Sequence, residues 1–115
     1  MASKKFVGLV EKIVVIGDRK IESLALCDSG ARSTSIDIGL AAKARLGPII
    51  KTTKIKSASV SREIRRPVVK AKIKIKGKTF NTEVNIQDRS HMTFPIIIGR
   101  NILTGNFIID TKKGV

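Results

Sequence analysis

The sequence predicts one all-β domain over residues 1–115. Within residues 67–75, Val, Ala and Ile alternate with three lysines, which is the pattern of a strand with one buried face. Runs rich in Val and Ile are separated by the turn sequences Gly17-Asp18 and Lys76-Gly77-Lys78. A chain of 115 residues suits one modest core, and no internal repeat or low-complexity segment divides it.

The first half of the chain is expected to hold a hairpin and one short helix. Residues 7–16 and 20–26 form the predicted hairpin around Gly17-Asp18. After a turn at Asp28-Ser29-Gly30, the segment Ser35-Ile36-Asp37 is expected to cap a short helix, which Gly47-Pro48 ends.

The second half is expected to be mostly strand. Residues 49–66 are basic and polar, and Lys76-Gly77-Lys78 joins the strand over 67–75 to the next one. The elements expected after that turn are a strand over 79–86, a loop over 88–91, a strand over 94–98, one helical turn over 100–103 and a last strand over 107–109.

The charge of the chain leaves several partners open. It has 23 Lys and Arg against 9 Asp and Glu, a formal net charge of +14. Such a surplus suits a nucleic acid, an acidic peptide or an anionic membrane surface. It equally suits a β-rich protein whose lysines keep it in solution and its sheet edges unpaired. With four Phe and no Trp or Tyr, any nucleic-acid contact would involve the phosphate backbone rather than base stacking.

No feature of the sequence points to a membrane or to secretion. No apolar run approaches the length of a membrane span, and Glu11 and Lys12 interrupt the only apolar stretch near the start. The single cysteine, Cys27, cannot form an internal disulfide. We therefore expect a cytoplasmic protein that has no membrane partner.

Two segments carry the chemistry. Asp28-Ser29-Gly30-Ala31 follows the apolar run Leu24–Cys27, and Gly99-Arg100-Asn101 follows the apolar run Phe94–Ile98. A carboxylate pair that shares one proton can act as general acid and base, but this chain offers only one aspartate in such a turn. The motif therefore predicts that two chains form the working unit.

These two segments resemble the signature of the retropepsin-like aspartic proteases. More closely, the chain resembles a small group of these proteins that is called ATP-dependent zinc proteases and is associated with ligases adding glutamate to a ribosomal protein. The segments that carry this likeness, in the group's order, are Phe6–Glu11, Asp28–Ser33, Arg66–Val69 and Asp88–Arg100.

The resemblance implies a closed β-barrel with a flap hairpin and one short helix, and a role for each motif residue. Asp28 would pair with its copy from a second subunit and activate a water. Ser29 would bond across the dimer, and Gly30 would leave room for the substrate backbone. The remaining support of the active-site loop would come from Ala31, Ile97, Ile98, Gly99 and Arg100.

The chain departs from the retroviral pattern at two places. Arg32 stands where those relatives have an acidic residue that pairs with the Arg of Gly-Arg-Asn, and Asp88 is a candidate partner for Arg32 or Arg100. The expected flap, residues 51–66, is basic rather than rich in glycine, which favours acidic, glutamate-rich substrates. Its expected substrate-binding residues are Lys54, Lys56, Ser57, Ala58, Ser59, Val60 and Arg62.

The sequence gives no support for a metal site, and we expect no cofactor. Cys27, His91 and two Met are too few soft ligands for a zinc site within one chain. Cys27 is interpreted as a small buried hydrophobe, with a nucleophile as the alternative. His91 is interpreted as a loop residue, with a role near the dimer interface as the alternative.

Three functions fit the sequence. The first is a homodimeric aspartic endopeptidase that acts on acidic peptides. The second is a non-catalytic dimeric module of the same fold that binds acidic protein or RNA through its basic surface. The third is a ribosome-associated basic barrel, which leaves both motifs unexplained.

Overall fold

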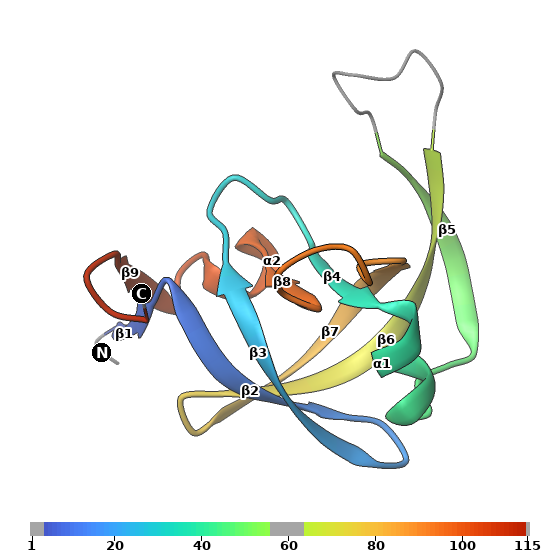
Figure 1. The fold of residues 1–115 in the computed structure, drawn as a ribbon, viewed down its shortest axis with the longest axis horizontal. Coiled ribbons are helices and arrows are strands. Elements are labelled where there is room, and N and C mark those ends of the chain that lie inside the picture. The colour runs from blue at the N-terminus through green and yellow to red at the C-terminus, as the bar shows by residue number, and fades with distance from the viewer. Residues whose placement is uncertain (1–3, 56–63, 115) are drawn as a thin grey trace.

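A closed barrel of six strands forms the body of the molecule (Figure 1). The computed structural model describes residues 4–55 and 64–114. Seven strands lie in one sheet in the order β2-β3-β8-β4-β7-β6-β5, and pairing of β2 with β6 closes the first six into a ring. The strands are β2 (Val10–Ile16), β3 (Lys20–Cys27), β4 (Thr34–Asp37), β5 (Ile49–Ile55), β6 (Ile64–Ile75), β7 (Lys78–Gln87) and β8 (Ile96–Ile98). The predicted all-β class and closed barrel are confirmed.

The two predicted turns join neighbouring strands of this barrel. β2 and β3 are antiparallel, with Ile16 opposite Lys20 across the Gly17-Asp18 turn. β6 and β7 are antiparallel, with Ile75 opposite Lys78. Lys76 and Gly77 have φ values of 53° and 76°, the left-handed conformation that a two-residue hairpin turn requires at both positions.

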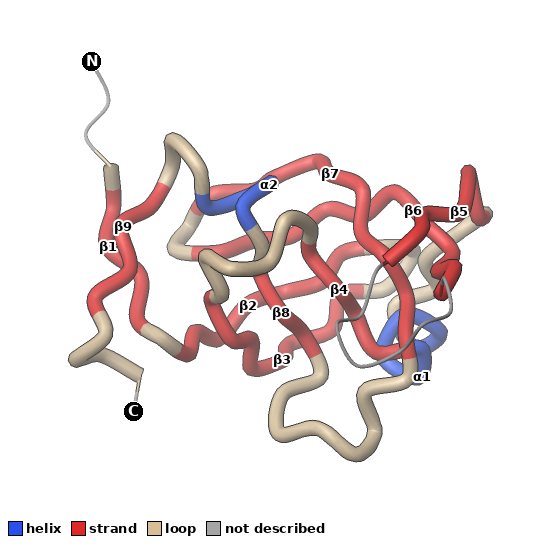
Figure 2. Tube along the Cα trace, turned by 90° about the horizontal axis from the view of Figure 1, so that it is seen from above, coloured by secondary structure: helices blue, strands red, loops and turns tan. Residues whose placement is uncertain are grey.

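The predicted strand over residues 7–16 is wrong in one respect, because the chain breaks at Leu9. β1 (Lys5–Gly8) pairs in parallel with β9 (Phe107–Asp110) in a separate two-stranded sheet, and β2 begins only at Val10. At the break, the Leu9 carbonyl accepts a bond from the Cys27 N–H at 2.8 Å, and the Leu9 N–H donates to the Lys113 carbonyl at 2.8 Å. The partners that redirect the chain are therefore far away in the sequence. Seen from above, the β1–β9 pair lies at one end of the molecule (Figure 2).

The short helices lie close to their predicted positions. α1 (Ile38–Lys43) begins at Asp37, whose side chain accepts bonds from the N–H groups of Gly39 and Leu40. Ser35 and Ile36 do not belong to its cap, since they lie in β4, a strand that the sequence did not predict. α2 (Arg100–Leu103) is the expected single turn after β8. Neither described helix has the length or the apolar composition that crossing a membrane requires.

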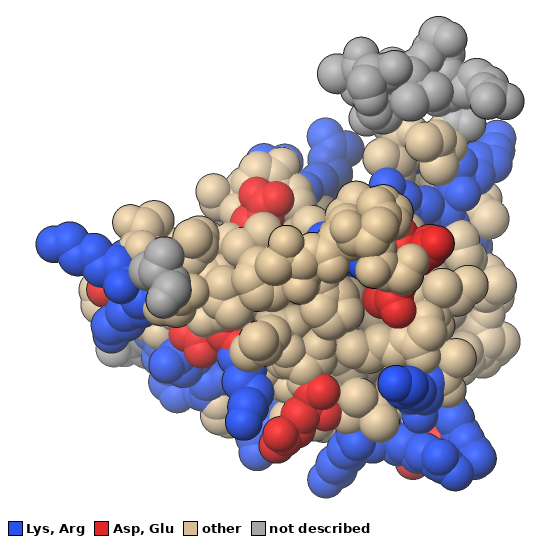
Figure 3. All heavy atoms as spheres, in the orientation of Figure 1, with Lys and Arg blue, Asp and Glu red and all other residues tan. Residues whose placement is uncertain are grey.

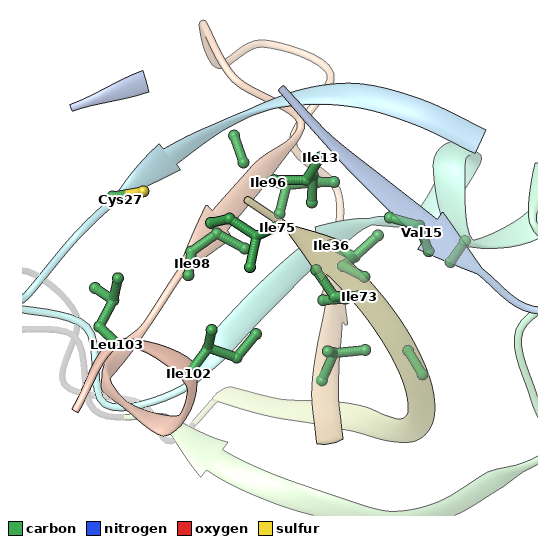
Figure 4. Packing of buried hydrophobic residues seen from close by; sticks show 14 of the residues in the cluster. Ile13, Val15, Cys27, Ile36, Ile73, Ile75, Ile96, Ile98, Ile102 and Leu103 are labelled. Carbon is green, nitrogen blue, oxygen red and sulfur yellow. The ribbon is translucent and has the colours of Figure 1, made fainter. Parts of the chain in front are cut away.

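The core fills the barrel with branched aliphatic side chains from most of its strands. On β6 the alternation is as predicted, with Val69, Ala71, Ile73 and Ile75 buried and the lysines between them exposed. Figure 4 shows Ile73 and Ile75 beside Ile13 of β2, Ile36 of β4, and Ile96 and Ile98 of β8. β8 thus packs on the core and pairs with β3 on one side and β4 on the other. This fixes the position of the residues that follow it.

Candidate active site

Parallel pairing of β3 with β8 brings the two sequence motifs together. Cys27 lies opposite Ile98, so both strands end at the same level and continue into Asp28 and Gly99. The Asp28 N–H donates to the Ile98 carbonyl at 2.9 Å, and the Arg100 N–H donates to the Ala31 carbonyl at 2.8 Å. Two segments about seventy residues apart are therefore joined by backbone hydrogen bonds on both sides of Gly99.

The turn after β3 holds the Asp28 carboxylate by its own backbone. Oδ1 of Asp28 accepts a bond from the Gly30 N–H at 2.8 Å, and the Ala31 N–H donates to the Asp28 carbonyl at 3.1 Å. This is an Asx turn, which Asp followed by Gly favours. Asp28 is half-buried, whereas Ser29 and Gly30 are exposed. The carboxylate is thus oriented at the surface of one chain.

Thr34 and Asn101 support this arrangement through side-chain hydrogen bonds, and the sequence analysis missed Thr34. Thr34, which is fully buried, accepts a bond from the Gly99 N–H at 3.1 Å and donates to Oδ1 of Asn101 at 2.8 Å. Asn101 in turn donates to the Thr82 hydroxyl at 2.9 Å and to the Glu83 carbonyl at 3.2 Å. The Asn of Gly-Arg-Asn thereby ties α2 to both β4 and β7.

The Asn85 side chain makes a second group of hydrogen bonds, which the sequence did not reveal. Its side chain, in a residue only 3% exposed, accepts a bond from the Ser35 hydroxyl at 2.7 Å. Its amide nitrogen donates to the Ser33 hydroxyl at 3.0 Å and to the Thr34 carbonyl at 3.1 Å. A buried polar group with several good partners rigidifies its surroundings, here the chain that leads from Asp28 into β4. The signal available in the sequence, an Asn inside an otherwise apolar strand end, is too common to single out.

A pocket of about 770 Å³ opens beside the turn, starting at Ala31. Its walls come from the segment after Asp28, from the facing parts of β5 and β6, and from the loop after β7. The pocket is cationic, since Arg32, Lys54, Arg66 and Arg89 line it. β5 and β6 pair antiparallel from Ile49 to Ile55 and from Ile64 to Val69, so the predicted flap segment is a hairpin as far as it is described.

Two of these arginines lie in surroundings that disfavour their charge. Arg89 is 5% exposed; its Nε donates to the Phe94 carbonyl at 2.9 Å, and its backbone N–H donates to the Asp37 carboxylate at 2.8 Å. Burial lowers the pKa of Arg89, which the charge of Asp37 partly offsets. Burial, and then the charge of Arg89, lowers the pKa of Arg66. Within residues 4–55 and 64–114, neither guanidinium is in an ion pair, so the pocket offers two partly desolvated cations to an anion.

The remaining predicted site residues have mixed outcomes. Lys54 lies on β5 and lines the pocket, while Lys56, Ser57, Ala58, Ser59, Val60 and Arg62 lie outside the described residues. The predicted pairing of Asp88 with Arg32 or Arg100 is wrong for the described part of the chain. Asp88 accepts a bond from the Ser90 N–H at 2.9 Å, and bonds from the Ser90 hydroxyl and N–H lower its pKa. Arg100 instead donates to the Ser29 carbonyl at 3.3 Å.

Cys27 and His91 have the environments that the sequence predicted. Cys27 is 2% exposed, and its burial, aided by the charge of Glu11, raises the pKa of its thiol to about 11. Such a thiol is a poor nucleophile at neutral pH. His91 is an exposed loop residue. Among the described residues, no three His, Cys, Asp or Glu side chains come close enough together to hold a metal ion.

Comparison with sequence families identifies one match. The family model described as RimB-like, for the retropepsin-like aspartic endopeptidase RimB, matches residues 36–114. The matched range contains Gly99-Arg100-Asn101 and begins after the Asp28 turn. No curated protein sequence matches the chain.

Solved structures resemble the molecule over most of its length. A protein of unknown function (DUF785) from Legionella pneumophila has a TM-score of 0.67 and 24% identity, covering 96% of this chain and 95% of that one. The EIAV protease, in complex with the inhibitor HBY-793, has a TM-score of 0.65 and 20% identity, covering 82% and 83%. The protease of simian foamy virus has a TM-score of 0.59 and 20% identity, covering 80% and 88%. These likenesses confirm the retropepsin-like fold.

Proposed function

The chain belongs to the RimB-like family of retropepsin-like aspartic endopeptidases, and on that premise we propose that it is a homodimeric aspartic peptidase whose catalytic groups are Asp28 and its copy in a second subunit. The observation that carries the proposal is the joining of the Asp28 turn to Gly99-Arg100 by the Asp28–Ile98 and Arg100–Ala31 backbone bonds. This arrangement holds a carboxylate at the surface of one chain in a fixed orientation.

In the proposed reaction, the two Asp28 carboxyl groups hold one proton and one water between them. Two carboxylates so close cannot both ionise freely, because their charges repel. The ionised group takes a proton from the water, whose oxygen forms a bond to the peptide carbonyl carbon. The protonated group gives its proton to the carbonyl oxygen. When this intermediate collapses, the C–N bond breaks and the leaving nitrogen takes the proton of the protonated Asp28 carboxyl. The ionised Asp28 takes a hydroxyl proton from the intermediate, so a carboxylic acid is released and the pair again holds one proton.

The β1–β9 sheet is the proposed interface with the second copy of the chain. Phe6 and Ile108 lie opposite each other on this sheet, and they are 54% and 46% exposed, although both are large and apolar. The opposite face of the sheet carries Val7, which is buried in the core. Since Leu9, directly after β1, bonds to Cys27, directly before Asp28, a copy bound here would lie next to the Asp28 turn. Burying the apolar pair would stabilise the dimer.

We propose acidic peptides as the preferred substrates because of the pocket beside the turn. The Arg66 and Arg89 guanidinium groups are partly desolvated, and a carboxylate between them would restore the interactions that burial has removed. Arg32 and Lys54 add positive charge around the same space. A glutamate side chain of the substrate suits this pocket better than a neutral glutamine of the same size.

The central test is peptide hydrolysis by the wild type and by Asp28→Asn, with oligoglutamate and matched oligoglutamine peptides read by mass spectrometry. We expect the wild type to cleave the acidic peptide and the variant to keep its fold and lose activity. The rate per chain should also fall on dilution as the dimer dissociates. Cleavage retained by Asp28→Asn would refute the mechanism.

Substrate preference is tested separately with Arg66→Gln. This variant should raise KM for the acidic peptide and leave KM for a neutral peptide nearly unchanged. Equal effects on both peptides would contradict the proposed role of the pocket. A folded dimer that binds oligoglutamate and cleaves no peptide at any pH would instead indicate the non-catalytic binding module.

A further inference from the structure

Three lysines point outward in a row from β6, on the outer face of the barrel. Lys70, Lys72 and Lys74 are all exposed and alternate with the buried Ala71 and Ile73. Since each residue advances a strand by about 3.3 Å, successive lysines are roughly 7 Å apart. Basic side chains gather along the lower edge of the molecule in Figure 3, where β2, β3 and β6 lie in Figure 1.

A fourth lysine extends this row across the barrel. Ile16 of β2 is opposite both Lys72 of β6 and Lys20 of β3, and residues directly opposite in antiparallel strands point to the same side. Lys20 is exposed. We call Lys20, Lys70, Lys72 and Lys74 the lysine face.

Two acidic residues that lie next to the lysine face are already paired with other lysines. Glu83 lies opposite Lys70, but its carboxylate is 2.8 Å from the Nζ of Lys51. Glu22 lies in the row of Lys74, and its carboxylate is 3.8 Å from the Nζ of Lys12. The face therefore keeps a positive surplus that these two carboxylates do not neutralise.

Protection of a sheet edge does not explain these lysines. Lysine on an edge strand discourages pairing with other chains. β6, however, is an interior strand at this point, because Lys72 and Lys74 each have a paired residue on β2 and on β7. Like charges on neighbouring positions of one strand face also repel each other, which is a cost that an anionic partner would remove.

The lysine face differs in composition from the pocket that begins at Ala31, because it contains no arginine. An arginine fork matches carboxylate and phosphate alike, whereas lysines bind phosphate groups as compact point charges that read no sequence. A groove of about 800 Å³ runs along Lys70 and Lys72, and on β7 it is bordered by Asn81 and by Glu83, the residue that is paired with Lys51.

Base stacking is not a feature of this face. The aromatic side chain nearest to it on β7 is Phe80, which lies opposite the inward-facing Ile73 and packs against Phe107 at 5.7 Å between ring centroids. We propose that the lysine face binds the phosphodiester backbone of nucleic acid, without reading its sequence. This inference does not depend on the proposed peptidase activity.

The test compares two triple variants that lose the same charge. One is Lys70→Gln/Lys72→Gln/Lys74→Gln, and the control is Lys4→Gln/Lys43→Gln/Lys112→Gln, which removes three exposed lysines elsewhere. Binding of a labelled 20-nucleotide single-stranded RNA, and of single-stranded and duplex DNA of the same length, is measured by fluorescence anisotropy over a salt series. The three nucleic acids show whether the backbone alone is recognised.

We expect the wild type to bind all three nucleic acids with a steep salt dependence. The β6 triple variant should bind RNA at least tenfold more weakly at about 0.1 M salt, and its slope of log K against log salt should fall by about 2, since each lost phosphate contact removes roughly 0.7. The control variant should stay close to the wild type. The wild type and both variants should hydrolyse oligoglutamate at the same rate. If the wild type does not hydrolyse it, neither variant should.

Three results would each overturn the inference. The first is that the wild type does not bind RNA at about 0.1 M salt. The second is that the control variant loses as much RNA affinity as the β6 triple variant. The third is that oligoglutamate of equal charge displaces the labelled RNA as strongly as unlabelled RNA does. The last result would identify the face as a second contact for acidic peptide. If the β6 triple variant melts well below the wild type, the single variant Lys72→Gln replaces it, with a slope change of about 0.7 expected.

Discussion

Gly99 lies at the closest approach between the two motif segments, and replacing it with alanine tests how the site is held. A Cβ at this position would lie 2.5 Å from the carbonyl carbon of Ser33 and 3.0 Å from the carbonyl oxygen of Ala31. The backbone of Gly99 has φ of −97° and ψ of −174°, which any residue can adopt. The cost of Gly99→Ala is therefore steric and falls on the chain between Asp28 and β4.

The size of the effect follows from the distance that the chain must yield. Ordinary van der Waals contact begins at 3.4 Å, so one segment must retreat from the other by about 1 Å. Both neighbours are backbone, which cannot rotate away as a side chain does. Overpacking of this kind costs about 1–3 kcal/mol of stability. The same shift strains the Arg100–Ala31 bond and displaces Asp28. Asp28 is the catalytic group of the proposed mechanism, and a misplacement of about 1 Å in such a group lowers the rate roughly 100-fold.

The assay combines urea unfolding with hydrolysis of the acidic peptide. Gly39→Ala is the matched control, because its new Cβ would meet only the end of the Asp37 side chain at 3.1 Å, within a helix that tolerates alanine. We expect Gly39→Ala to change stability by less than about 1 kcal/mol and to keep full activity. Wild-type stability and activity in Gly99→Ala would show that the close approach at Gly99 does not position the site.

Three further predictions concern the Cys27 thiol, the buried Asn85 side chain and the exposed apolar pair of Phe6 and Ile108. Burial raises the pKa of Cys27 from 9.0 to about 11, so the unfolded thiol loses its proton first, and stability falls as the pH rises between these values, by at most about 3 kcal/mol. Comparing unfolding free energies at pH 8 and pH 10.5 should show a smaller loss in Cys27→Ala than in the wild type. Asn85→Leu leaves polar groups of β4 without their partner and should lower stability by about 3 kcal/mol in urea unfolding. Phe6→Asp should weaken the dimer at least tenfold, by about 1.4 kcal/mol or more, in sedimentation equilibrium.

Each of these predictions has an outcome that contradicts it. Identical pH dependence in Cys27→Ala and the wild type would mean that the thiol titrates alike in both states. Asn81→Leu changes an exposed asparagine of the same strand. An equal loss of stability in that variant would contradict the importance of the buried Asn85 hydrogen bonds. Leu24→Asp alters another exposed apolar residue, and it should leave the dimer intact if the β1–β9 sheet is the interface.

The sequence predicted those parts of the fold whose causes are local. The alternation on β6, the Lys76-Gly77 turn and the Asp37 cap of α1 each depend on residues within a few positions of one another. The two motif segments were also visible, because each consists of an apolar run that ends in a turn sequence. Their resemblance to the retropepsin-like proteases then indicated that they belong together.

Features that depend on distant partners were not visible in the sequence. The break at Leu9 is caused by bonds to Cys27 and Lys113, and β4 exists because β7 and β8 flank it. The Asp88 prediction was wrong because Ser90, two residues away, offered that carboxylate a closer partner.

The sequence by itself determined the all-β class, the turns, the single Asp-Ser-Gly motif and the strong positive charge. The tertiary structure decided which groups share one place: Asp28 beside Gly99, Asn85 beneath the turn, and Arg66 beside Arg89 in a pocket. The physical reason is that periodicity and turn chemistry act along the chain, whereas burial, hydrogen-bond partners and charge neighbours are set by strands that meet across the barrel.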